Sequence, residues 1–196
     1  MVCACALAIV RGIRLYGDRQ QLRQELIRFH VVANSDSPQD QAVKLQVRDA
    51  VLESIRTDLL QIGDIRSAKI YLEENLTEIQ KIADDTLKRA GFSEQVTVSL
   101  CREEFDTRIY DTFTLPSGVY ESLRIIIGEG NGHNWWCVTF PNLCLPAASE
   151  TFSDVAAGAG FSEELTRALE NRDGYEIHFF LLDALGQLEN ILHTSK

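Results

Sequence analysis

The spacing of apolar residues changes along this chain, and that change limits the folds available to it. From residue 38 to residue 90 the apolar positions follow the 3.6-residue period of one face of an α-helix. At residues 96–101 and 122–127 they recur at every second position, which is the period of a half-buried β-strand. The sequence therefore predicts helices followed by strands, an arrangement typical of the α+β class.

Two long helices are predicted for the first of these parts. Ser37 is a good capping residue for the first helix, and Pro38 suits a first helical turn because it has no N–H to satisfy. The second helix is expected to open at Asp64 or Ser67 and to stop at Gly91, since glycine readily adopts the left-handed conformation that ends many helices. Its buried face is predicted to consist of Ile65, Ala68, Leu72, Leu76, Ile79, Ala83, Leu87 and Ala90.

Strands are predicted on both sides of the two helices. The apolar run Ile27–Ala33 precedes them as a buried strand, and alternating runs at 96–101 and 122–127 follow them. A turn with Pro116 and Gly118 favours antiparallel pairing of those two runs, and 135–140 is expected to form a further strand. The predicted fold is α+β, with a mixed or antiparallel sheet of about four to five strands and two long helices packed on one side.

The two ends of the chain are less regular. Residues 147–160 are mostly small and predict a loop, with a short helix expected at 162–169 and a strand, a helix or both at 175–192. At the other end, residues 1–24 contain an apolar run from Val2 to Val10, shorter than the roughly 20 residues of a membrane-spanning helix. Two interpretations stay open for it, a clipped export signal and a helix packed on the domain. Residues 25–196 are expected to form a single globular domain.

The charge of the chain bears on its partners. The formal net charge is -10, and basic residues cluster only in short arms such as Arg11–Arg28. Proteins that bind nucleic acid need a patch of lysine and arginine to neutralise phosphates. We therefore expect a protein partner and no nucleic acid.

The stretch GEGNGHNWWCVTFPNLC, residues 128–144, concentrates residue types that carry chemistry or recognition. Its first part has Gly128, Gly130 and Gly132 after a predicted strand, as in dinucleotide-binding loops. That fingerprint needs a helix to begin at the third glycine, so that the N-terminus of the helix meets a phosphate. Here a strand is predicted instead, so we expect a wide loop and no cofactor.

Histidine and cysteine in this stretch allow a second chemical interpretation. His133, Cys137 and Cys144, with His30 or His178 as a fourth ligand, have the donor atoms that zinc prefers, although their spacing is poor for a chelating loop. Cys137 beside a histidine base would instead give a thiol nucleophile. The alternative to a binding protein is therefore a zinc- or thiol-dependent hydrolase. In an oxidising compartment, however, we expect a disulfide between Cys137 and Cys144 and no metal.

The adjacent tryptophans Trp135 and Trp136 must point to opposite faces of a strand. One of them is expected to fill the core. The other is then exposed or covered by a loop, and an exposed tryptophan beside a glycine loop is typical of a protein-binding hot spot.

Three runs of the sequence together carry a family resemblance. They are RFHVVANSDSPQDQAVKLQVRDAV (28–51), GVYESLRIIIGEGNGHNWWCVTFPNLC (118–144) and IHFFLLDALGQL (177–188). From about residue 25 onward the chain resembles the stage II sporulation protein R family of endospore-forming Gram-positive bacteria.

The resemblance implies a signalling protein and not an enzyme. Members of this family are made in the forespore and exported to the space between the two membranes. There they prompt a membrane-embedded aspartic peptidase to cleave the pro-form of sigma-E, and contact with the outer face of that membrane is compatible with this role. This chain departs from the family at its start, because members usually carry a longer hydrophobic export segment preceded by basic residues.

Two motifs are predicted to form the surface that meets the peptidase: the polar turn Asn34–Gln41 and the loop of glycines and tryptophans, Gly128–Trp136. They adjoin if the first strand neighbours the strand that ends at Gly128. A structural interpretation stays open beside this one, because Asn34, Ser35 and Asp36 also suit the entry to a helix, where their side chains bond to the backbone. The predicted partner-binding residues are Asn34, Asp36, Asp40, Gln41, Gly128, Glu129, Gly130, Gly132, His133, Asn134, Trp135 and Trp136.

Overall fold

The computed structural model describes residues 17, 21–110, 112–141 and 152–170. The described residues of 26–102 and 121–147 belong to one compact unit, and those of 1–25, 103–120 and 148–196 belong to a second. The predictions made for residues 1–16 and 175–192 lie outside the described residues. The single-domain assignment of 25–196 stays a prediction.

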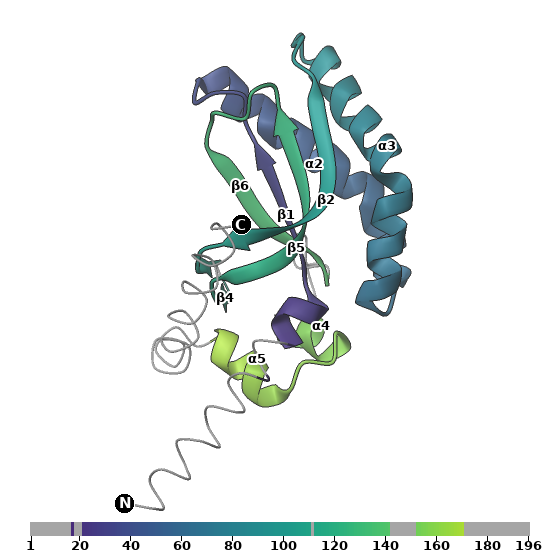
Figure 1. The fold of residues 1–196 in the computed structure, drawn as a ribbon, viewed down its shortest axis with the longest axis vertical. Coiled ribbons are helices and arrows are strands. Elements are labelled where there is room, and N and C mark those ends of the chain that lie inside the picture. The colour runs from purple at the N-terminus through teal and green to yellow at the C-terminus, as the bar shows by residue number, and fades with distance from the viewer. Residues whose placement is uncertain (1–16, 18–20, 111, 142–151, 171–196) are drawn as a thin grey trace, which may run out of the picture. The chain divides into compact units, whose positions relative to one another are not determined.

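The first unit is built around a four-stranded sheet with the order β2-β5-β1-β6. Its strands are β1 (Ile27–Val32), β2 (Val96–Phe105), β5 (Gly118–Ile127) and β6 (Asn134–Phe140). Strand β1 runs parallel to β5 and antiparallel to β6, so the sheet is mixed. The glycine loop, residues 128–133, joins β5 to β6 along the chain, but the two strands are not neighbours because β1 lies between them (Figure 1).

Two long helices cover one face of this sheet, as predicted (Figure 1). Helix α2 spans Pro38–Gln61 and helix α3 spans Ile65–Arg89. Ser37 caps α2 by accepting a hydrogen bond from the N–H of Asp40, and Asp64 caps α3 by accepting one from the N–H of Ser67. The helices and the inward-facing residues of β1 and β5 share one core, which contains Phe29, Val31, Val43, Val47, Val51, Ile55, Leu72, Ile79, Ala83, Leu87, Leu123 and Ile125.

Helix α3 ends where the sequence indicates. Gly91 has a φ of 85°, in the left-handed region, and the N–H of Phe92 reaches back to the carbonyl of Leu87 at 3.0 Å. Such a bond satisfies a carbonyl that the helix leaves without a partner. The chain then turns directly into β2.

The second unit contains short elements. Strands β3 (Arg108–Ile109) and β4 (Thr114–Leu115) pair antiparallel, and the helices are α4 (Phe152–Gly158) and α5 (Glu163–Glu170). The short helix expected at 162–169 is confirmed as α5. The loop predicted for 147–160 is wrong for α4, because Phe152 and Ala156 lie one turn apart and are both buried, which stabilises a helix that the small residues alone do not signal.

Burial in the α3 core gives a first prediction. Leu72 is fully buried, so Leu72→Ala should lower the free energy of unfolding by about 2–5 kcal/mol through lost burial and the cavity left behind. Leu60→Ala is the matched control, because Leu60 is 54% exposed and its truncation should change stability by less than about 0.5 kcal/mol. Urea unfolding followed by circular dichroism measures both. Equal effects would contradict the described packing of α3.

Candidate interaction surface at the carboxyl ends of β1 and β5

Parallel pairing brings the two sequence motifs together. Because β1 and β5 run in the same direction, with Val32 opposite Ile126, their carboxyl ends lie at the same edge of the sheet. The segment 33–37 leaves β1 at this edge, and the glycine loop 128–133 leaves β5 beside it. The predicted adjacency of the two motifs is therefore confirmed.

Asn34 shapes the glycine loop through its side chain and its backbone. Its Oδ1 accepts a hydrogen bond from the N–H of Glu129 at 3.0 Å, and its carbonyl accepts one from the N–H of Asn131 at 3.1 Å. Next to it, the carbonyl of Ala33 accepts the N–H of Gly132 at 2.9 Å. Three loop residues, Glu129, Asn131 and Gly132, are thus bonded to the end of β1, which fixes the loop conformation.

Asp36 and His133 close the outer side of the same junction. The Oδ1 of Asp36 accepts a hydrogen bond from the N–H of His133 at 2.6 Å and also contacts the ring Nδ1 of His133. The two side chains are 53% and 81% exposed. The hydrogen bond from the main-chain N–H of His133, followed by that from its ring, lowers the pKa of Asp36.

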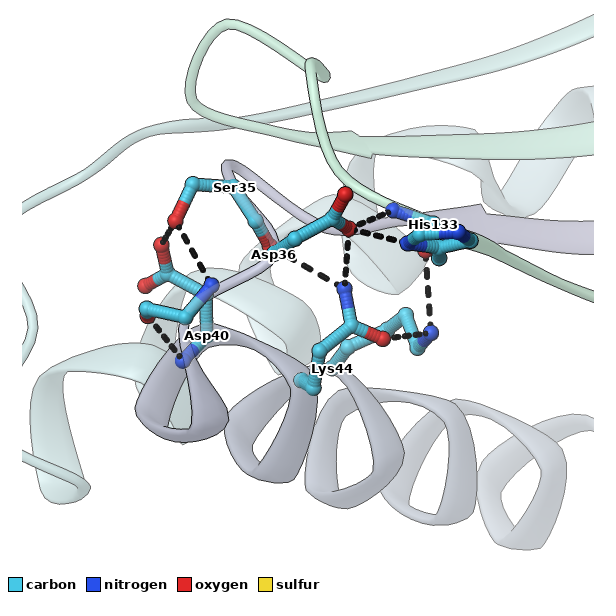
Figure 2. A network of polar contacts seen from close by, with 7 residues as sticks. Ser35, Asp36, Asp40, Lys44 and His133 are labelled. Carbon is cyan, nitrogen blue, oxygen red and sulfur yellow. Dashed lines mark hydrogen bonds and ion pairs between the residues drawn. The ribbon is translucent and has the colours of Figure 1, made fainter.

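Asp40 and Gln41 tie the first turn of α2 to the chain that enters it (Figure 2). Asp40 is 8% exposed and accepts hydrogen bonds from the hydroxyl of Ser35 and, at 3.5 Å, from the side-chain amide of Asn34. The amide of Gln41 donates to the carbonyl of Ser35 at 3.0 Å and to Asp36 at 3.3 Å. These polar groups hold the helix entry in place, as the structural interpretation predicts.

Lys44 connects α2 to the glycine loop. Its Nζ donates to the Oε1 of Gln41 at 2.6 Å and to the carbonyl of His133 at 2.9 Å (Figure 2). The side chain is buried, and this burial lowers the pKa of Lys44. Sequence reasoning missed Lys44, because a lysine within a helix usually signals a solvated face.

Two glycines of the loop are required by close packing. A Cβ at Gly128 would lie 2.3 Å from the Oδ1 of Asn34, and a Cβ at Gly132 would lie 2.2 Å from the backbone oxygen of Ser35. Gly132 is followed by β6 and not by a helix, so the context of a dinucleotide-binding loop is absent. The glycines here allow two backbones to approach each other.

Both tryptophans pack against other side chains on opposite faces of the sheet. Trp135 lies on the helix face, with its ring centroid 5.8 Å from that of Phe29 and the Arg48 guanidinium 4.8 Å above it. Trp136 lies on the other face and stacks on the His30 ring at 4.7 Å, with the planes 4° apart. Each is only partly buried. Trp135 thus joins the core, as expected of one of the pair, and Trp136 is held by His30.

His30 also fixes the position of Asn134. The side-chain amide of Asn134 bonds the Nδ1 of His30 at 2.7 Å, next to the stacked Trp136. His30 is 3% exposed and lies on β1, whereas Asn134 and Trp136 lie on β6. This part of the predicted surface therefore contributes to the pairing of β1 with β6.

The exposed part of the site is small. Its exposed side chains are those of Asp36, Glu129, Asn131 and His133, which we call the edge surface, and the exposed backbone of Gly128 adjoins them. Asn131, which sequence reasoning missed, donates from its side-chain amide to Glu129 at 3.1 Å. An asparagine between two glycines was its signal. The other predicted polar residues are less exposed: Asn34 bonds to Asp40, Gln41 bonds to Ser35 and Asp36, and Asn134 bonds to His30.

The hydrolase alternative finds no support among the described residues. Cys137 is 6% exposed and its thiol contacts the carbonyl of Val138 at 3.9 Å, whereas His133 is engaged by Asp36. Within the described ranges, no group of three histidine, cysteine or acidic residues is placed to hold a metal ion. Cys144 and His178 lie outside these ranges. Cys137 is a free thiol, which speaks against the disulfide to Cys144 that the sequence predicts.

Comparison with known proteins agrees with the resemblance carried by these motifs. The family model for stage II sporulation protein R matches residues 23–150, which include both motifs of the site. The chain is also 33% identical over 183 residues to the stage II sporulation protein R of Bacillus subtilis, with 84% of this chain and 81% of that protein covered. The chain belongs to the stage II sporulation protein R family.

No solved structure matches the chain significantly. Among the described helices, none combines the length and the apolar character needed to cross a bilayer.

The close approach at Gly132 gives a second prediction. Gly132→Ala should destabilise the protein by about 1–3 kcal/mol, because the new methyl group meets the backbone of Ser35 and forces the two motifs apart. Gly63→Ala is the control, since a Cβ there would have no atom within 4 Å and the change should be neutral or slightly stabilising. Thermal unfolding of both variants measures the difference. A neutral Gly132→Ala would show that the motifs are not in contact.

The Asp36–His133 contact gives a third prediction, about pKa. Folding lowers the pKa of Asp36 below 3.8, so its carboxylate contributes stability at neutral pH that is lost as the pH falls through the lowered value. His133→Ala should raise this pKa only part of the way back, because the main-chain N–H of residue 133 remains. Carboxyl chemical shifts in an NMR titration measure the pKa in both proteins. A full return to 3.8 would mean that the backbone bond is not formed.

Proposed function

We propose that this protein is an exported sporulation signal that activates a membrane-embedded aspartic peptidase to cleave pro-sigma-E. It is made in the forespore and acts in the space between the two membranes. It acts through protein–protein contact and needs neither a catalytic residue of its own nor a cofactor. The proposal rests on membership of the stage II sporulation protein R family. It also rests on the hydrogen bonds that hold the edge surface in a fixed conformation.

The observation that carries the contact mechanism is the rigidity of the edge surface. Its loop is bonded to Asn34 and Ala33 behind it and to Lys44 beside it, so its shape is set before any partner arrives. A preformed surface binds without the entropy cost of ordering a loop. Four exposed polar side chains then present charges and amides of both donor and acceptor character.

The chemistry of the described residues supports a role without catalysis. A nucleophile needs a base within hydrogen-bonding reach and a group that orients the base. His133 has an orienting carboxylate in Asp36, but the buried thiol of Cys137 is not its partner. The contact with Asp36 instead holds the His133 ring in place at the surface.

The edge surface provides the test of this function. Pro-sigma-E and the membrane peptidase are co-expressed in a non-sporulating host, with and without this chain fused to an export signal. Cleavage should depend on the exported chain. Glu129→Lys should then reduce cleavage roughly tenfold or more, the size expected for a residue at the centre of an interface.

A matched variant separates contact from general charge effects. Glu73→Lys makes the same charge change on an exposed position of α3 and should leave cleavage unchanged. Both variants should unfold at the wild-type temperature. These are better probes than Trp136→Ala, because Trp136 packs on buried His30 and its truncation would also affect folding. The absence of cleavage despite detected export and a functional peptidase would overturn the proposed function.

A further inference from the structure

The sheet has a second feature, along the side of its terminal strand β2, that the proposed function does not use. Strand β2 is the terminal strand on that side among the strands that the structure describes. A terminal strand carries main-chain N–H and C=O groups that have no neighbouring strand. What these groups face decides whether the edge is available to a partner.

Two hydrogen bonds establish which groups point outward. The carbonyl of Gln95 accepts the N–H of Gly128, directly after β5, so Gln95 faces the sheet. The N–H of Val96 points the other way and donates to the Oδ1 of Asp84 on α3 at 3.0 Å. Because main-chain groups alternate along a strand, the N–H and C=O groups of Val98 and Leu100 also point away from β5.

A groove of about 510 Å³ lies beside Val98. One wall is the flank of α3, and Val98 represents β2 in the lining. The α3 positions extend from Leu76 to Lys88, which is roughly 18 Å at the rise of an α-helix. That length accommodates about five residues of extended chain at about 3.4 Å each. The groove therefore combines an open strand edge with a helix wall, an arrangement that suits addition of a peptide strand.

The charges in the groove indicate what kind of segment fits. Its lining holds two lysines, Lys81 and Lys88, and two aspartates, Asp84 and Asp85, so its formal charge is balanced, whereas the whole chain carries -10. Asp84 is already engaged by the N–H of Val96. The balanced charge of the groove therefore does not favour a cationic ligand, whereas the net charge of the whole chain does. Leu76 and Val98 offer apolar contact to alternate side chains of a bound strand.

We propose that the groove between α3 and β2 binds an uncharged, extended segment of a partner protein by strand addition. The segment pairs with the outward main-chain groups of Val98 and Leu100 and spans about five residues. A concave groove fits a single protruding strand, whereas a second copy of this chain would present another concave groove. This site shares no residue with the edge surface, so the proposal of strand addition does not depend on the proposed function.

A displayed library of linear peptides selected on the full chain tests this site. The blocking variant is Gln80→Trp, which places a bulky ring in the groove from an exposed helix position. The control is Gln46→Trp, which makes the same change on an exposed position of α2. We expect enriched peptides with alternating uncharged residues that bind the wild type and Gln46→Trp equally and lose at least about tenfold in affinity for Gln80→Trp.

Amide hydrogen exchange with the best such peptide tests the pairing itself. Exchange at Val98 and Leu100 should slow at least about tenfold, whereas Thr97 and Ser99 should change little because they face β5. Failure to enrich any peptide that is sensitive to Gln80→Trp would overturn the proposal. So would a peptide that protects Thr97 and Ser99 instead, or self-association of the chain that protects Val98 and Leu100 without peptide.

Discussion

The parallel pairing of β1 with β5 is the constraint on which the rest of the first unit depends. It brings two segments 95 residues apart in sequence to one edge, where the side chain of Asn34 bonds to the backbone of Glu129. A backbone amide in an irregular loop has no partner from regular secondary structure, and leaving it buried without a hydrogen bond costs free energy. Here the end of β1 supplies those partners, so the glycine loop has a fixed shape although it has no regular secondary structure.

Local features of the first unit were readable from the sequence, whereas strand order was not. The caps Ser37 and Asp64 and the stop at Gly91 depend on the chemistry of single residues, and all three are confirmed. The insertion of β1 between β5 and β6 depends on long-range pairing, which no local pattern reports. A mixed sheet was predicted as one of two options, and the parallel pair with β5 decides between them.

The candidate site shows the same division. The glycines and Asn34 were identified from composition, but the inward position of Lys44 and the stacking of Trp136 on His30 were not, because both depend on tertiary neighbours. Lys44 illustrates the physical reason. Burial disfavours its charge, and the carbonyl of His133 and the amide oxygen of Gln41 compensate by accepting hydrogen bonds from its Nζ. Gln41 is a neighbour of Lys44 on any helix, but the carbonyl of His133 comes from a distant part of the chain that no local pattern reports.

The structural and the binding interpretations of the two motifs are therefore not alternatives. Most of their polar groups form hydrogen bonds within the protein, since Asp40 bonds to Ser35 and Asn34 bonds to the loop. Those internal bonds determine where the few exposed side chains stand. A partner that touched only His133 and Glu129 would still depend on every residue behind them, because a shift of the loop moves both. A small contact surface can therefore require long, unusual motifs, because most of the motif residues position the few that are exposed.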